Sequence, residues 1–337
     1  MMRNSTAISV VSGVLAIVLV FLSLIAFLNT VPLEVSRYEG SDIGAIWKEG
    51  RRICDGKNPY SRIHREGVDR IRKPPTYLPG FYLFGCALDG LGVDSFREFM
   101  PIWWKVNYAL LLFLASSFYL IFKRAEMPIV GLVCMASWLF GRWGAFGLVT
   151  LQTNFAGMVP LLWSLALVEK RPRTAMVLFG ISLLMKQVAI FLLPLFLLWW
   201  WERRERSSPL PYLLKGMFWM VGLPLLVSLP FFIHDASGFL KSIGYSAGRN
   251  PGGGMPFLRG IGSAATLVMF AGMALVYLGA WRREVSKLSA AALIMLCFIT
   301  MNGTFFRQYL LWFLLLAPLP LLELRRFLDS KQKLAAG

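Results

Sequence analysis

Charged side chains that stand in or beside apolar sequence are the residues whose types could carry chemistry. Asp42 lies in a polar stretch directly after the first apolar run, and Lys186 lies inside the apolar run 174–201. A carboxylate can act as a general base, whereas Lys meets a phosphate as a point charge and Arg meets it through two parallel hydrogen bonds. An ionisable residue in an apolar segment is costly and is functional by default. These residues could therefore supply a general base and a cation that meets an anionic group.

The cations that could hold a phosphate are three. Lys186 is the first choice, ahead of Arg307 in the step Asn302–Tyr309 and Arg249 in the Gly-rich loop 248–254. Each has a plainer interpretation, because a lysine can snorkel or pair with another helix and an arginine can anchor at the interface or sit in a loop. Arg142, between two glycines, ranks below them.

The polar side chains beside these cations could bind substrate. Gln152 and Asn154 can hydrogen-bond a sugar or phosphate, or they can simply cap a helix. Asp42 could likewise be only an N-terminal helix residue, because Ile43, Ile46, Trp47 and Ile53 follow at helical spacing and predict an amphipathic helix on the membrane surface.

The elements that position these residues are membrane helices. Of 337 residues, 57% are hydrophobic and only 16% charged, against roughly 25% charged in a soluble domain. The composition excludes a water-soluble fold and predicts an all-α, polytopic membrane protein with one domain. The formal charge of +17 falls in short clusters between apolar runs, which indicates membrane topology and not nucleic-acid binding.

About ten or eleven transmembrane helices are expected, because apolar runs approach the roughly 20 residues that cross a bilayer. The first run, 7–28, is interpreted as a retained anchor and not a signal peptide. The remaining apolar segments are 76–93, 102–122, 127–148, 153–169, 174–201, 214–233, 260–281, 288–301 and 306–323.

The basic clusters suggest the orientation, because Lys and Arg in short loops stay in the cytoplasm. All clusters lie on that side if 174–201 is a hairpin with Lys186 at its outer tip and 76–93 is re-entrant or made of short pieces. Alternatively, Lys123 and Arg124 break the rule and 174–201 is one tilted span. Either way, the loops 29–75 and 234–259 are expected outside, and the first of them carries ten basic and seven acidic residues.

The cysteines and histidines indicate neither a disulfide framework nor a metal site. Three of the four cysteines lie in apolar segments, and only Cys54 lies in a long polar loop. His64 and His234 are far apart in sequence and have no acidic residue at ligand spacing. The sequence also has no phosphate-binding P-loop, no dinucleotide fingerprint and no HExxH motif, so no cofactor is expected.

Four motifs in order resemble glycosyltransferase family 87, whose members are GT-C type membrane enzymes that use polyprenyl-phosphate sugars. The first outer loop begins its helix at Asp42 and ends in Asn58-Pro-Tyr60, followed by the aromatic and proline step Tyr77-Leu-Pro79. Leu151-Gln152-Thr-Asn154 resembles the family's GQxN step, with Leu in place of Gly. The segment Gly180 to Lys186 resembles the family's Lys-Pro segment, although Gln187 replaces the proline. The Lys-Gln pair at this place instead resembles the dolichyl-phosphate-glucose glucosyltransferases.

The resemblance implies a GT-C-like bundle and an inverting transfer of mannose or another hexose or pentose from a polyprenyl phosphate. Asp42 would be the general base, Lys186, Arg307 and Arg249 would meet the donor phosphate, and the substrate would contact Tyr60, Tyr77, Gln152, Asn154 and Gln187. A glycolipid or other envelope acceptor is expected at the extracytoplasmic face of a bacterial plasma membrane, with membrane lipids as neighbours.

Two other functions fit parts of the sequence. A transporter or flippase for a lipid-linked or anionic substrate would place charges at mid-membrane and usually show repeated halves, which are not found here. A purely structural membrane subunit would leave Asp42 and Lys186 unexplained.

Overall fold

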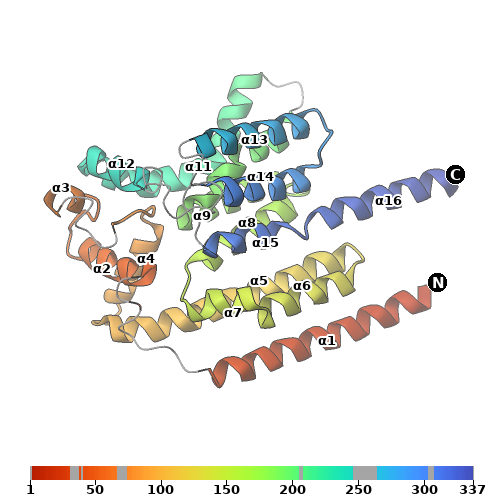
Figure 1. Ribbon diagram of the computed structural model, residues 1–337, viewed down its shortest axis with the longest axis horizontal. Coiled ribbons are helices and arrows are strands. Elements are labelled where there is room, and N and C mark those ends of the chain that lie inside the picture. The colour runs from red at the N-terminus through yellow and green to blue at the C-terminus, as the bar shows by residue number, and fades with distance from the viewer. Residues whose placement is uncertain are drawn as a thin grey trace.

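The computed structural model describes residues 2–30, 38, 41–66, 74–204, 208–245, 264–302 and 307–336, and these residues form helices and connecting turns without a strand. Long helices lie side by side along the molecule, and shorter ones gather at one end, near α2 and α12 (Figure 1). The elements are α1 Met2–Leu28, α2 Asp42–Cys54, α3 Arg62–Glu66, α4 Gly80–Asp89, α5 Phe96–Arg124, α6 Pro128–Phe140, α7 Arg142–Val149, α8 Asn154–Leu167, α9 Pro172–Met185, a 3-10 helix Gln187–Leu192, α10 Leu193–Trp201, α11 Pro209–His234, α12 Ala236–Gly244, α13 Ala264–Trp281, α14 Lys287–Met301, a 3-10 helix Arg307–Tyr309, α15 Leu310–Leu316 and α16 Pro320–Ala336.

The all-helical prediction is confirmed for the described residues. Fewer of the described helices are long enough to cross a membrane than the ten or eleven that were expected. Four described helices are long and apolar enough to cross a membrane, namely α1, α5, α11 and α13, or five if the bent pair α6 and α7 is one span. The predicted run 306–323 is also broken, because α15 ends at Leu316 and α16 begins at Pro320. Proline and glycine at the breaks explain why the apolar runs overestimated unbroken helix length.

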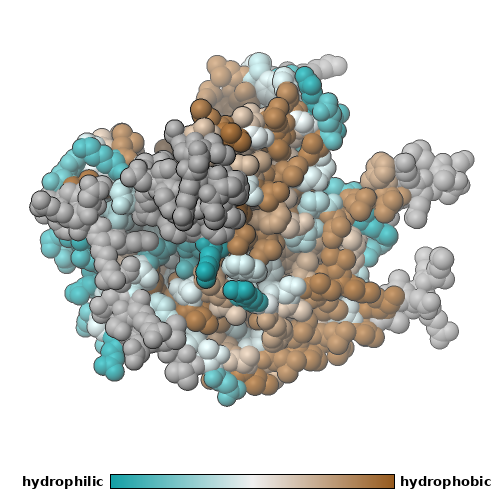
Figure 2. Space-filling model, in the orientation of Figure 1, coloured by the Kyte–Doolittle hydropathy of each residue, from teal (hydrophilic) through white to brown (hydrophobic). Residues whose placement is uncertain are grey.

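The basic clusters meet at one end of the bundle, which we call the basic end. Two ion pairs there join the tail helix α16 to earlier connections, Arg325 to Glu126 at 3.4 Å and Arg326 to Glu169. A third joins Lys287, the first residue of α14, to Glu202 after α10. The opposite end, the loop end, carries α2, α3, α4 and α12 (Figure 1). Hydrophilic surface covers much of the loop end, whereas the visible side of the long helices is largely hydrophobic (Figure 2).

The segment 172–201 folds back on itself, as the hairpin interpretation predicts. Pro172, where α9 begins, and Trp200, near the end of α10, line one hollow at the basic end. The turn between them is at Lys186, whose backbone is extended with φ −151° and ψ 114°. Lys186 and Gln187 therefore lie at the far tip of this hairpin.

The segment 76–93 contains a single short helix, in keeping with its re-entrant interpretation. Helix α4 has 10 residues, about half of what a full crossing needs. Helix α2 packs directly on it, and the glycines allow this approach, since a Cβ on Gly50 would lie 2.8 Å from backbone atoms of Gly85 and Cys86. The apolar face of α2, expected on the membrane surface, is thus buried within the protein, and Trp47 packs against Phe99.

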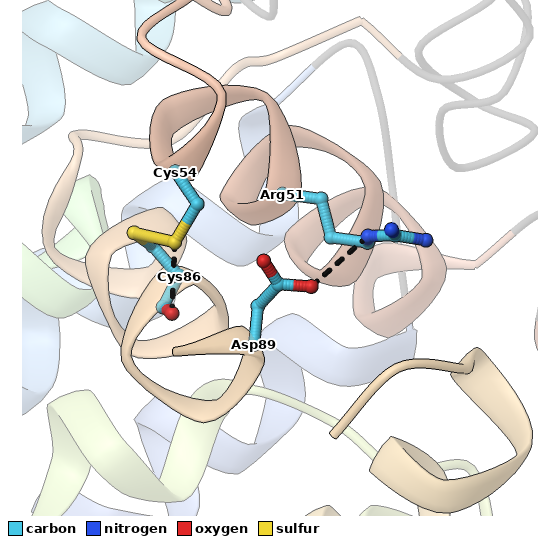
Figure 3. Close-up of a disulfide and its surroundings, with 4 residues drawn as sticks. All are labelled: Arg51, Cys54, Cys86 and Asp89. Atoms are coloured by element: carbon cyan, nitrogen blue, oxygen red, sulfur yellow. Dashed lines mark hydrogen bonds and ion pairs between the residues drawn. A yellow bond between two sulfur atoms is a disulfide. The ribbon is translucent and has the colours of Figure 1, made fainter. Parts of the chain in front are cut away.

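A disulfide joins Cys54 at the end of α2 to Cys86 in α4, which corrects the expectation that no disulfide is present (Figure 3). The ion pair between Arg51 and Asp89, 3.0 Å apart, lies beside it. Asp89 is the last residue of α4 and pairs with α2 through this contact. The spacing of the cysteines did not reveal the pair, because only the packing of α2 on α4 brings them together.

Replacing Cys54 by Ser should destabilise the protein by about 3–4 kcal/mol, because the disulfide closes a loop across a sequence separation of 32. Alkylation of denatured, unreduced protein should modify Cys134 and Cys297 in the wild type and additionally Cys86 in the variant. Cys134→Ser is the matched control and should leave the melting temperature in detergent responsive to reductant. Modification of all four cysteines in unreduced wild-type protein would contradict the disulfide.

A buried ion pair fastens α3 to α2. Glu49 is fully buried and its Oε1 accepts a hydrogen bond from Arg62 Nη1 at 2.7 Å. Burial raises the pKa of Glu49 above its ordinary value, and the charge of Arg62 opposes that rise. Removing one partner of such a pair leaves an uncompensated buried charge.

Arg62→Met should therefore destabilise the protein by about 3 kcal/mol at neutral pH, and acid should partly reverse the loss. The folded-state pKa of Glu49 lies above the unfolded value, so the folded state binds the proton more tightly and stability rises as pH falls through the folded-state pKa. Melting temperatures of the wild type and the variant at neutral pH and at about pH 5 measure how much of the lost stability acid restores. The control is Arg52→Met, because Arg52 lies farther from Glu49, at 3.5 Å. An equal loss at both pH values would contradict the assignment.

Candidate functional site

Three residues from distant parts of the chain meet at the loop end. The hydroxyl of Tyr77 donates a hydrogen bond to Asp42 Oδ2 and accepts one from Lys186 Nζ at 3.0 Å. Lys186 Nζ also lies 3.5 Å from Asp42 Oδ2. Asp42 and Lys186, named from the sequence on separate grounds, thus form one buried ion pair bridged by Tyr77.

Two of the three residues stand at the end of a helix, and the third lies in a connection between helices. Asp42 is the first residue of α2, where a carboxylate is favoured by the helix dipole. Lys186 follows the last residue of α9, and its extended backbone turns the chain at the hairpin tip. Tyr77 lies in the connection before α4. Since α2 is packed on α4 and joined to it by the disulfide, the position of Asp42 relative to Tyr77 depends on that contact.

The environment of Lys186 compensates for its burial. Lys186 is only 3% exposed, and its Nζ donates to Thr153 Oγ1 at 3.0 Å as well as to the Tyr77 hydroxyl. Its ammonium also lies 4.5 Å from the centre of the Tyr77 ring, where the negative face of the ring attracts a cation. Burial raises the pKa of Tyr77, and the neighbouring carboxylate of Asp42 raises it further, so the phenol stays protonated and can donate to Asp42.

Gln152 and Asn154 are the sequence neighbours of Thr153, which accepts a hydrogen bond from Lys186. Asn154 is fully buried at the start of α8, and its Oδ1 accepts a hydrogen bond from Trp312 Nε1 at 2.9 Å. Its Nδ2 donates to Gln152 Oε1 at 3.4 Å. The indole of Trp312 is the contact by which α15 reaches the site.

The turn before Thr153 is strained at Leu151, whose φ is +50°. Gln152 N donates to Gly147 O at 2.9 Å and Leu151 N donates to Leu148 O at 3.1 Å, which are the two bonds of a Schellman motif. Glycine usually occupies the left-handed position of this motif. Leu151 is the residue that departs from glycine in the GQxN-like step, so the substitution places a buried leucine where the backbone favours glycine.

Gln187 and Tyr60 support the site from outside the ion pair. Gln187 Nε2 donates to the backbone oxygen of Thr76 at 3.1 Å, next to Tyr77. Tyr60 is fully buried and its hydroxyl donates to the backbone oxygen of Tyr77 at 2.7 Å. Both were expected to contact substrate, and in the structure both hold the segment that carries Tyr77.

The two arginines of the expected phosphate site are placed differently from Lys186. Arg307 begins a 3-10 helix and is exposed, and none of the described hydrogen bonds or ion pairs links it to Lys186. Arg249 lies outside the described residues. Within the described ranges the structure therefore brings together Asp42, Tyr77 and Lys186.

Sequence reasoning missed Thr153 and Trp312, although Thr153 lies inside the motif that drew attention to its neighbours. It also found no acidic residue at ligand spacing from either histidine, whereas His64 lies 3.3 Å from Asp235 and His234 lies 3.4 Å from Asn58. The described residues contain no cluster of three or more His, Cys, Asp or Glu that could hold a metal ion. The described ion pair itself offers one carboxylate, one phenol and one ammonium group.

Comparisons of this chain with models of protein families, with curated proteins and with solved structures find no match.

Substituting Leu151 by Gly should leave the protein about 1 kcal/mol more stable than substituting it by Ala, because both lose the buried side chain and only glycine relieves the left-handed backbone. Leu165, buried within α8, is the matched control. There the Ala variant should be more stable than the Gly variant by roughly 0.5–1 kcal/mol. Melting temperatures of the four variants measure the two differences. The same order at both positions would contradict strain at Leu151.

Proposed function

We propose that this protein is an inverting glycosyltransferase that takes a sugar from a polyprenyl-phosphate donor. The observation that carries the proposal is the buried ion pair of Asp42 and Lys186, with the oxygen and nitrogen atoms 3.5 Å apart. A general base and a phosphate-binding cation must act on atoms of the same substrate pair, so they must lie within a few ångströms of each other. The motif resemblance supplies the substrate class.

The reaction needs few protein groups, because the donor already carries a good leaving group. Asp42 would accept the proton of the acceptor hydroxyl as its oxygen attacks the anomeric carbon. The bond from that carbon to the phosphate oxygen breaks at the same time, and polyprenyl phosphate leaves with the electron pair. Lys186 would neutralise the phosphate. Attack opposite the leaving group inverts the configuration at the anomeric carbon.

Tyr77 would orient the base. Its hydroxyl donates to Asp42 Oδ2, which directs one oxygen of the carboxylate toward Lys186. A donor phosphate that attracts Lys186 would weaken this ion pair and leave Asp42 a stronger base. Donor binding and base activation would thus be linked through one ammonium group.

Two independent features support a membrane orientation with the site outside. Lys and Arg gather at the basic end, which is the pattern of a cytoplasmic face. The disulfide lies at the opposite end, and disulfides persist in oxidising compartments. The shorter apolar helices α8, α9 and α14 would complete the crossings between these ends, in a GT-C-like bundle of a bacterial plasma membrane with a glycolipid or other envelope acceptor.

Asp42→Asn should lower kcat for sugar transfer by about 10²–10⁴, because the amide cannot accept the acceptor proton. The assay follows radiolabelled sugars from a panel of polyprenyl phosphates into lipid extract, with the protein reconstituted in vesicles. The control is Asp55→Asn at the other end of α2, where Asp55 is exposed and paired with Lys57.

Lys186→Met in the same assay should raise the KM for the donor more than Tyr77→Phe does, because only the lysine carries a charge for the phosphate. Melting temperatures establish that each variant is folded. Full activity of Asp42→Asn would remove Asp42 as the base. Passage of intact donor across the vesicle membrane without any sugar transfer would favour a flippase instead.

A further inference from the structure

A cavity of about 770 Å³ lies at the basic end of the bundle, away from the Asp42 and Lys186 pair. Helices α5, α8, α10, α14 and α16 contribute its lining residues. Its size falls within the roughly 300–1,000 Å³ of sites for small ligands. The proposed glycosyl transfer makes no use of this cavity.

The lining has an ionic part and an apolar part. The ionic residues come from the end of α5, from the connections after α5 and α8, and from within α16, and they are Arg124, Glu126, Glu169, Lys170, Arg325 and Arg326. The apolar walls include buried Leu288 and Leu322 and the indole rings of Trp163 and Trp199. Trp residues are typical of the level where lipid headgroups meet hydrocarbon.

The ionic part carries an excess of positive charge. Four cations and two carboxylates line the cavity, which leaves a formal charge of +2. Arg325 pairs with Glu126 and Arg326 pairs with Glu169, so the excess corresponds to Arg124 and Lys170. Both of these side chains are exposed. The nearby Lys287 is paired with Glu202 and lies 5.9 Å from the ring of Trp199.

We propose that this cavity binds an anionic phospholipid, with the phosphate beside Arg124 and Lys170 and the upper acyl chain against the apolar walls. Basic pockets between membrane helices bind anionic headgroups in this way. The net charge favours an anionic headgroup over a zwitterionic one. The apolar walls favour a lipid over a free phosphate, which would contact only the ionic part.

Native mass spectrometry of the full chain in detergent tests this proposal. The probes are phosphatidylglycerol and phosphatidylcholine with identical acyl chains, and the readout is the ratio of their dissociation constants. The wild type should prefer phosphatidylglycerol, and the Arg124→Gln/Lys170→Gln variant should lose roughly tenfold of that preference. The control is Arg282→Gln/Arg283→Gln, which removes the same charge from the connection between α13 and α14 without touching the cavity.

A second variant keeps the proposal testable if the double variant does not fold. Ala166→Phe fills the cavity without changing its charge, and it should weaken binding of both lipids. Equal losses in the Arg282/Arg283 control would show that general surface charge and not the cavity attracts the lipid, and would overturn the proposal. Displacement of phosphatidylglycerol by an equal concentration of inorganic phosphate would also overturn it, because the site would then be one for free anions.

Discussion

The arrangement of this protein depends on how one lysine charge is held in an apolar bundle. Lys186 is almost fully buried, and an unpaired ammonium group there would cost several kcal/mol or lose its proton. Asp42 supplies the opposite charge, while Tyr77 and Thr153 supply hydrogen-bond acceptors. These partners come from three other parts of the chain. The start of α2, the connection before α4, the residue before α8 and the hairpin tip must therefore meet for the ion pair to form.

The contact between α2 and α4 sets the precision of that meeting. Gly50 lets the two helices approach backbone to backbone, and the disulfide from Cys54 to Cys86 fixes how far one can slide along the other. The ion pair of Glu49 and Arg62 holds the next turn of chain against α2. Because Asp42 is the first residue of α2, any rotation of this helix would move its carboxylate away from Tyr77. The contacts of α2 with α3 and α4 thus together set the position of the Asp42 carboxylate.

Sequence alone identified the two ends of the ion pair but not what surrounds it. Asp42 and Lys186 stand out because charge beside or within apolar sequence is costly. The basic clusters suggested a hairpin at 174–201 but left a single tilted span as the alternative. Thr153 and Trp312 gave no such signal, since a threonine and a tryptophan are ordinary in membrane segments. Cys54 and Cys86 could not be paired without the packing of α2 on α4. The breaks between α6 and α7 and between α15 and α16 were also missed, because apolar runs report composition and not backbone continuity.

The helix break at Lys186 determines both the course of the chain and the position of the candidate site's lysine. A continuous helix through 172–201 would have placed Lys186 in the middle of a span, away from α2 and its carboxylate. The extended backbone at Lys186 instead ends α9, begins the return through α10 and turns the ammonium group toward Asp42. The same turn brings Arg173 and Arg203 to the lining of one hollow at the opposite end. One backbone turn thus completes the candidate site and gathers basic residues at the other end of the hairpin.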